Sequence, residues 1–166
     1  MYTQTFAQFK KQLGQLDKWL GTATDHAKSK NFDPDVFVTL RLAPDQFPLA
    51  RQVQIACDTP KLAVYRITGR EAPSHADTEK TIPELRARIE TTLGILDAFQ
   101  PKDFEKSSTQ VVSQPRWEGK TMTGGDYFME HAVPNFFFHV VTAYAILRHN
   151  GVELGKGDYL GKLSFR

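Results

Sequence analysis

The sequence is poor in cysteine: Cys57 is the only one among 166 residues. A single cysteine excludes an intramolecular disulfide and a zinc site built from several thiolates. Its neighbour Asp58 would raise the pKa of the thiol rather than activate it. We therefore interpret Cys57 as a small buried hydrophobic residue.

An excess of charge of one sign is also missing. The chain has 21 basic and 19 acidic residues, a net charge of +2 and a pI of about 8.6. No basic run with interleaved aromatic residues stands out, so we expect no nucleic-acid partner.

No hydrophobic run is long enough to span a bilayer, which needs about 20 residues. The most apolar stretch, 132–147, is shorter and is interrupted by polar residues and a proline. The first residues lack the charged start and apolar run of a secretory signal. We expect no membrane association and a cytoplasmic, reducing location.

Several catalytic motifs are absent as well. The sequence has no Gly-rich phosphate loop, no Gly-x-Ser-x-Gly and no His-Glu-x-x-His. It also lacks the paired Glu-x-x-His of di-iron bundles. These absences exclude P-loop nucleotide chemistry, serine hydrolases of the α/β type, zincins and ferritin-like oxidases.

What is present is helical periodicity in a chain of single-domain length, which we take as one domain over 1–166. Apolar residues recur at steps of three and four, which predicts long helices over 4–29, 47–68, 81–99 and about 132–149. Four such helices predict an all-α four-helix bundle. The long connections at 30–47 and 100–125 indicate a topology other than simple up-down-up-down.

Shorter elements should lie between these helices. Asp33 and Pro34 predict a short helix to about Leu40 that buries Val36, Phe37 and Leu40. Thr81 and Glu84 form a capping-box pattern before the third helix.

The region 105–120 should form a small hairpin or flap, with strands at 110–113 and 116–118. A short helix is expected over 126–131, followed by a kink or a new helix at Pro134. The glycine-rich tail after Gly151 should lie extended on the surface. Arg88, in the third helix, should face water.

Candidate site residues lie on two polar stripes. Asn135, His139 and Thr142 share one face of the apolar last helix, so they must find partners inside the fold. A polar stripe on the second helix either faces solvent or faces the polar stripe of the last helix. A pocket between these helices would be lined by Gln54, Asp58, Asn135, His139 and Thr142. The loop His75-x-Asp77-x-Glu79 superficially resembles a metal cluster, but acidic residues often alternate in polar loops, and we expect no metal there.

Three segments resemble a bacterial protein family of unknown function. They are 41–58 (RLAPDQFPLARQVQIACD), 77–81 (DTEKT) and 134–151 (PNFFFHVVTAYAILRHNG), and the resemblance covers most of the chain. That family is placed in the DinB/YfiT-like superfamily of four-helix metalloenzymes. The resemblance implies a divalent metal held by three histidines, one on the second helix and two in a His-x-x-x-His on the last. Some members use low-molecular-weight thiols in transferase or isomerase reactions.

The three-histidine pattern is not intact in this sequence. The last-helix pair falls on Asn135 and His139, and the second-helix ligand falls near Gln54 or Asp58. Asp58, Asn135 and His139 are therefore the candidate ligands for one divalent metal such as Zn, Ni or Mn. The alternative is a metal-free hydrogen-bond network that fixes the register of the helices.

Two functions follow as hypotheses. The first is a metal-dependent enzyme of the small-molecule transferase or hydrolase type, with His139 as metal ligand or general base. The second is a non-catalytic, metal-free bundle that binds a small ligand or associates with itself. A homodimer is expected by analogy with the superfamily, with the apolar seam of the first helix and the flap at 99–117 as its surface.

Overall fold

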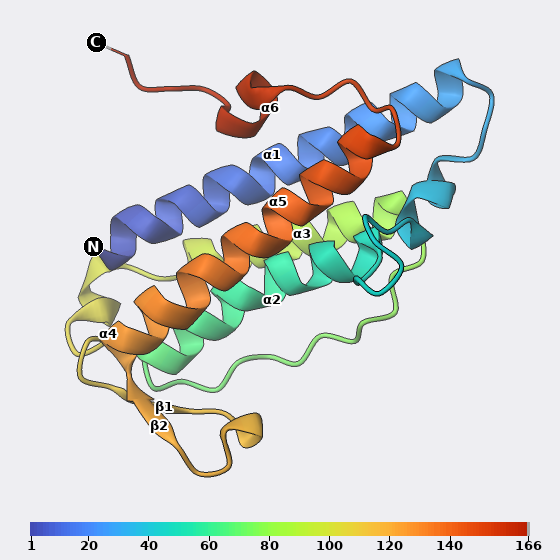
Figure 1. Cartoon of the computed structure of the whole chain (residues 1–166). Coiled ribbons are helices and arrows are strands. Elements are labelled where there is room, and N and C mark those ends of the chain that lie inside the picture. Colours follow the sequence, from blue (N-terminus) through green and yellow to red (C-terminus); the bar gives the residue numbers. More distant parts are fainter. Residues whose placement is uncertain (166) are drawn as a thin grey trace.

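Four long helices form the body of the protein in the computed structural model, which describes residues 1–165. They are α1 (Tyr2–Ser29), α2 (Leu49–Ile67), α3 (Ile82–Asp97) and α5 (Val133–His149). α1 contacts α3 and α5, and α2 contacts the same two helices, so the four surround one core (Figure 1). The predicted all-α four-helix bundle is confirmed.

The helices do not alternate in direction along the chain. α1 and α5 run one way and α2 and α3 run the other, as the colours in Figure 1 show. The connection over 68–81, which we call the strap, therefore returns along the whole length of α2. The topology is indeed not up-down-up-down, but the strap causes this rather than the connections at 30–47 and 100–125.

The helix-start signals in the sequence are reproduced. The Thr81 hydroxyl accepts from the Glu84 backbone N–H (3.3 Å), and the Glu84 carboxylate accepts from the Thr81 N–H (3.0 Å). This is the predicted capping box, and it fixes where the strap ends and α3 begins.

The short helix after α1 is a 3₁₀-helix, η1 (Pro34–Thr39), capped by Asp33 as predicted. Phe37 is buried, but Val36 is 50% exposed, so the prediction that Val36 is buried was wrong. With three residues per turn, Val36 aligns with exposed Thr39 instead of packing inward.

The predicted hairpin exists with a different second strand. β1 (Val111–Ser113) pairs antiparallel with β2 (Thr121–Thr123), not with 116–118. Residues Pro115–Trp117 instead form the 3₁₀ turn η3 between the strands. Pro115 cannot donate a ladder hydrogen bond, and its fixed φ suits the first position of a helical turn. A further 3₁₀ turn, η2 (Pro101–Phe104), precedes the hairpin.

After the hairpin the chain is helical without a break to His149. α4 (Gly124–Asp126) leads into the π-helix η4 (Tyr127–Ala132), which leads into α5. Pro134 has no N–H and its ring would clash with the carbonyl four residues earlier. The wider π turn lies immediately before it, so the chain stays helical where a kink or a new helix was predicted.

The tail leaves α5 at Gly151, whose φ of +88° suits a helix-ending glycine. It then forms a short helix, α6 (Lys156–Leu160), so the prediction of an entirely extended tail was wrong. α6 lies on α1: Gln12 donates to the Tyr159 carbonyl (3.2 Å) and the Trp19 indole N–H to the Asp158 carbonyl (3.3 Å). Within residues 1–165, no helix has both the length and the apolar character of a membrane span.

Candidate functional site

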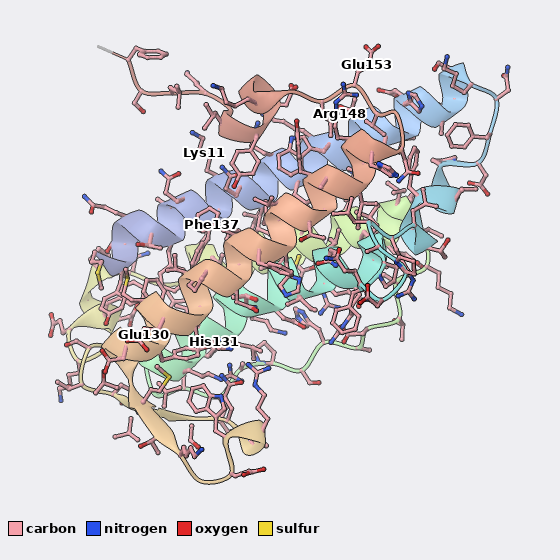
Figure 2. All side chains as sticks on the ribbon, viewed as in Figure 1. Lys11, Glu130, His131, Phe137, Arg148 and Glu153 are labelled. Atoms are coloured by element: carbon pink, nitrogen blue, oxygen red, sulfur yellow. The ribbon has the colours of Figure 1, made fainter. Side chains whose placement is uncertain are left out.

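A cavity of about 490 Å³ lies between α2, η4, α5 and the hairpin loop. Three of the five residues named as a pocket from the sequence, Asp58, Asn135 and His139, line it. Its other polar lining residues are Arg51, Thr59, Arg66, Gln114, Arg116, Tyr127 and His131, and its apolar ones are Phe47, Ile55 and Leu62. Figure 2 marks His131 near the end of the bundle that carries the hairpin.

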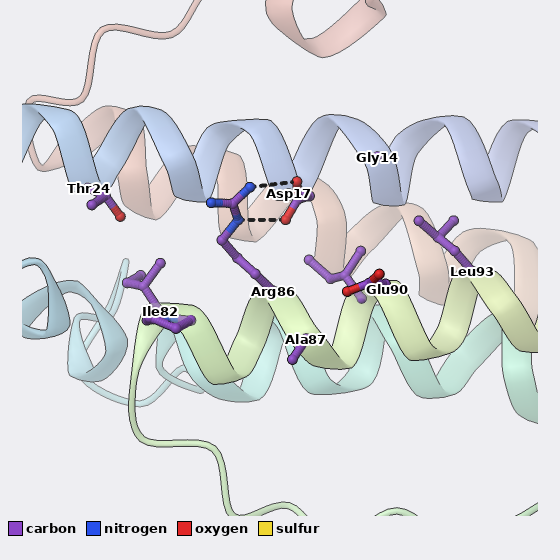
Figure 3. A pocket seen from close by; sticks show the side chains of 10 residues that line it. Gly14, Asp17, Thr24, Ile82, Arg86, Ala87, Glu90 and Leu93 are labelled. Carbon is purple, nitrogen blue, oxygen red and sulfur yellow. Dashed lines mark hydrogen bonds and ion pairs between the residues drawn. The ribbon is translucent and has the colours of Figure 1, made fainter.

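A second hollow of about 530 Å³ lies between α1 and α3 (Figure 3). Its main charged groups are already paired, because Arg86 binds Asp17 through two hydrogen bonds of 2.7 and 3.0 Å. No histidine or cysteine lines it. We interpret it as a groove between packed helices and centre the candidate site on the α2–α5 cavity.

Two predicted pocket residues lie elsewhere. Gln54 donates to Glu79 in the strap (2.9 Å), on the side of α2 that faces α3. Thr142 donates to the Phe138 carbonyl of its own helix (2.7 Å). The predicted set of five therefore splits into three residues on the cavity and two outside it.

His139 is held in one orientation by a glutamine on α2. Gln52 donates its amide N–H to the Phe47 carbonyl (3.0 Å), which turns its Oε1 toward His139 Nδ1 (2.7 Å). Nδ1 must then carry the proton, and Nε2 keeps a free lone pair. Burial, with a smaller contribution from Arg51, lowers the pKa of His139 to about 4. The imidazole is therefore neutral at pH 7 and offers an acceptor.

Asn135 is oriented in the same way. Its Nδ2 donates to the Thr59 hydroxyl (2.8 Å), which itself donates to the Ile55 carbonyl (2.7 Å). The Asn135 Oδ1 is left as a second acceptor beside the cavity. Asn135 and His139 thus find their partners on α2, as expected for polar groups on a buried helix.

The α2 partners were missed from sequence. Gln52, Thr59 and Arg66 are spaced seven residues apart and share one face of α2 with Ile55 and Leu62. This heptad spacing was the available signal. The sequence analysis followed the neighbouring stripe through Asp58, which faces α3 and the strap.

Arg88 does not face water, contrary to the sequence prediction. It is 5% exposed and lies at the centre of an ion network whose carboxylates are more exposed than Arg88 itself. One terminal nitrogen donates to Glu79 (2.8 Å) and to the Ala76 carbonyl (3.0 Å). The other lies 3.0 Å from both Asp58 and Asp77, close enough for ion pairs without aligned hydrogen bonds.

The network ties the strap to α2 and α3. Lys61 pairs with Asp58 (2.8 Å) and Arg51 pairs with Asp77. Burial raises the pKa of Glu79, but hydrogen bonds from Arg88, the backbone and Gln54 outweigh it and hold that pKa below its usual value. The acidic loop that resembled a metal cluster is therefore paired with cations.

The donor set of the cavity does not suit a divalent metal. Residues 1–165 contain no group of three His, Cys, Asp or Glu side chains placed to share an ion. His139 and Asn135 offer one acceptor each, and the Asp58 carboxylate is already shared by Arg88 and Lys61. Arg51, Arg66 and Arg116 also line the cavity and would repel a cation.

Cys57 is not part of the site. It is fully buried, and burial raises its pKa to about 12, with a hydrogen bond to Thr92 and the Arg88 charge opposing the shift. The interpretation of Cys57 as a small buried residue agrees with this position.

Comparison with known proteins places the chain in a family. The model described as "Domain of unknown function (DUF1993)" matches residues 1–160. The solved structure of a DinB family member protein from Shewanella denitrificans is similar, with 50% sequence identity and a TM-score of 0.95. The match covers 99% of this chain and 94% of that one. A search of curated proteins gives no match. The chain therefore belongs to the DUF1993 family and is DinB-like over nearly its whole length.

Proposed function

We propose that the protein binds a small molecule in the α2–α5 cavity without a metal, and that His139 accepts a hydrogen bond from it. The orientation of His139 by Gln52 carries this proposal, because it leaves the Nε2 lone pair unused in a cavity-lining residue. Asn135 Oδ1 adds a second fixed acceptor.

The low pKa favours binding over acid–base catalysis. A general base works best when its pKa lies near the operating pH. At about 4, the pKa of His139 gives a weak base at neutral pH but leaves a good hydrogen-bond acceptor. The metal-free binding function is therefore better supported than the metal-dependent enzyme.

The binding role is tested with phenol as a small hydrogen-bond donor, and with toluene as its isostere without a donor. In nitrogen-detected NMR of the histidine rings, phenol should shift the Nε2 resonance of His139, whereas toluene should leave it unchanged. Equal responses to the two probes, or a spectrum with the proton on Nε2, would contradict the proposal.

Metal content separates this proposal from the enzyme hypothesis. Untagged wild-type protein should contain no stoichiometric Zn, Ni or Mn by elemental analysis. One equivalent in the wild type that disappears in His139→Ala and persists in His75→Ala would replace our proposal with the metal site at Asp58, Asn135 and His139. The His75 variant is a matched control because His75 lies in the strap, outside the cavity.

Self-association is a second candidate function, favoured by a different surface than the sequence suggested. The α1 seam is buried inside the bundle and is not available. On α5, Phe138 and Val141 are 56% and 46% exposed and lie three residues apart, on one face. We propose this face for a homodimer; light scattering after size exclusion at several concentrations tests it, and a strict monomer would exclude it.

A further inference from the structure

The hairpin end of the cavity carries two arginines without a carboxylate partner. Arg66 donates to the Tyr127 hydroxyl (3.0 Å), and Arg116 lies against His131 Nε2. Neither forms an ion pair with any carboxylate of residues 1–165, whereas Arg51, about four turns before Arg66 on α2, pairs with Asp77. The positive charge of these two side chains is therefore not neutralised within the part of the chain that is described.

The contact with Arg116 decides which nitrogen of His131 is protonated. A guanidinium only donates, so His131 Nε2 must accept and Nδ1 must carry the proton. Burial, with Arg116 and Arg66 nearby, lowers the pKa of His131 and keeps the ring neutral. The Nδ1–H is buried and has no partner among residues 1–165.

Gln114, in the loop after β1, supplies a further unmatched donor. It is 7% exposed and lines the cavity, and its Nε2 has no hydrogen-bond partner in the described chain. A buried amide without a hydrogen-bond partner lowers the stability of the fold, so buried amides normally have one. The unmatched side-chain groups of Arg66, Arg116, His131 and Gln114 are all donors.

We propose that this end of the cavity is an oxyanion subsite, which holds the carboxylate or phosphate of the small molecule whose other end reaches His139. A carboxylate or phosphate offers only acceptors and a negative charge, which complements two free guanidinium groups and two unmatched N–H donors. Asp58 does not compete for the arginines, because Arg88 and Lys61 already hold it.

The spacing of the two ends constrains the ligand, and this step rests on the proposed function. His131 and His139 are eight residues apart, which is about 12 Å along the helix axis. Inorganic phosphate is too small to touch both ends. An elongated molecule with an oxyanion at one end and an O–H or N–H donor at the other would touch both ends. Ile55 and Leu62 also line the cavity and would contact the apolar middle of such a molecule.

The subsite is tested by isothermal titration calorimetry on the full chain, with inorganic phosphate and 3-(4-hydroxyphenyl)propanoate as probes. We expect both to bind the wild type, and Arg66→Gln and Arg116→Gln each to weaken binding at least about tenfold. Arg70→Gln is the matched control, since Arg70 pairs with Asp103 outside the cavity, and it should bind like the wild type.

Two results would overturn the subsite. One is that neither oxyanion binds at about 10 mM, a concentration well above the Kd of an ordinary weak complex. The other is unchanged binding in Arg66→Gln and Arg116→Gln, with thermal unfolding confirming that the variants are folded.

A neutral probe separates this failure from failure of the proposed function. If 3-(4-hydroxyphenyl)propanamide binds in a His139-dependent way and the oxyanions do not, the subsite is refuted and the His139 site stands. If none of the probes binds, both proposals fall.

Discussion

Replacing Arg88 by methionine tests whether the Arg88 ion network holds the strap on the bundle. Methionine keeps an unbranched side chain but removes the charge. The change removes the cation that Asp58, Asp77 and Glu79 share. Asp58 keeps Lys61 and Asp77 keeps Arg51, so Glu79, whose side chain is 13% exposed, is the carboxylate left without a cation from residues 1–165. Removing one partner of a buried ion pair typically costs about 3–5 kcal/mol, because the remaining charge is left uncompensated. We expect Arg88→Met to lose that much of the free energy of unfolding.

Arg86→Met is the matched control, two residues away on the same helix. Arg86 binds Asp17 with good geometry, but the two side chains are 46% and 32% exposed (Figure 3). Exposed pairs contribute roughly 0.2–1 kcal/mol. The same substitution should therefore destabilise the protein several times less at position 86.

Urea unfolding followed by circular dichroism measures both variants, with the free energy of unfolding extrapolated to water. A loss below about 1 kcal/mol for Arg88→Met, equal to that of Arg86→Met, would refute the network as a stabilising unit. A pH series gives an independent readout. In Arg88→Met the pKa of Glu79 should rise, because its only cation within the described chain is gone, so lowering the pH toward 5 should begin to protonate it and reduce the loss. A loss that does not change with pH would indicate missing packing rather than missing charge.

Three further predictions concern single residues. The pKa of His139 is lowered to about 4 in the fold, so wild-type stability should fall between pH 6.5 and 4 by roughly 3 kcal/mol, and His139→Gln should flatten this dependence in urea unfolding. Gly124→Ala should destabilise by about 2 kcal/mol or more, because a Cβ there would lie 2.0 Å from the Ser107 carbonyl, whereas at Gly125 the nearest atom is 3.4 Å away and the same change should be milder in thermal unfolding. Cys57 should not react with a thiol reagent in the native state, since it is fully buried with a pKa of about 12, and should react fully in urea; rapid native labelling would contradict its burial.

The sequence was sufficient for the long helices because their apolar seams repeat at helical spacing for many turns. The prediction failed in short segments that adopt a 3₁₀ turn instead of an α-helix or a strand. Val36 was placed on an α-helical face that a 3₁₀ turn does not have. The second hairpin strand was placed on residues that Pro115 directs into a turn. Local geometry of this kind depends on a few residues, and periodicity over so short a range does not determine it.

The sequence indicated the site residues more completely on α5 than on α2. On the apolar helix α5, Asn135 and His139 stood out because a buried polar residue needs a partner. On α2, Gln52 and Thr59 lie among other polar residues, and their heptad spacing was one of two polar stripes that could have faced α5. Arg88 looked exposed because charged residues usually are. Its burial depends on Asp77 and Glu79, which come from a strap whose path along the bundle is a tertiary feature.

The strap also determines the charge that a ligand would meet. Two of its acidic residues, with one from α2, balance three cations in a single network: Asp77, Glu79 and Asp58 against Arg51, Lys61 and Arg88. Asp58 and Arg51 both line the cavity, and this network neutralises both of them. The charge left at the cavity is then that of Arg66 and Arg116, which is positive. Among residues 1–165, Asp58 is the one carboxylate on the cavity that could have paired with those arginines, and it is held instead by Arg88 and Lys61. The strap acids Asp77 and Glu79 hold Arg88 in that position, so on our proposal the strap indirectly favours an anionic ligand in the α2–α5 cavity.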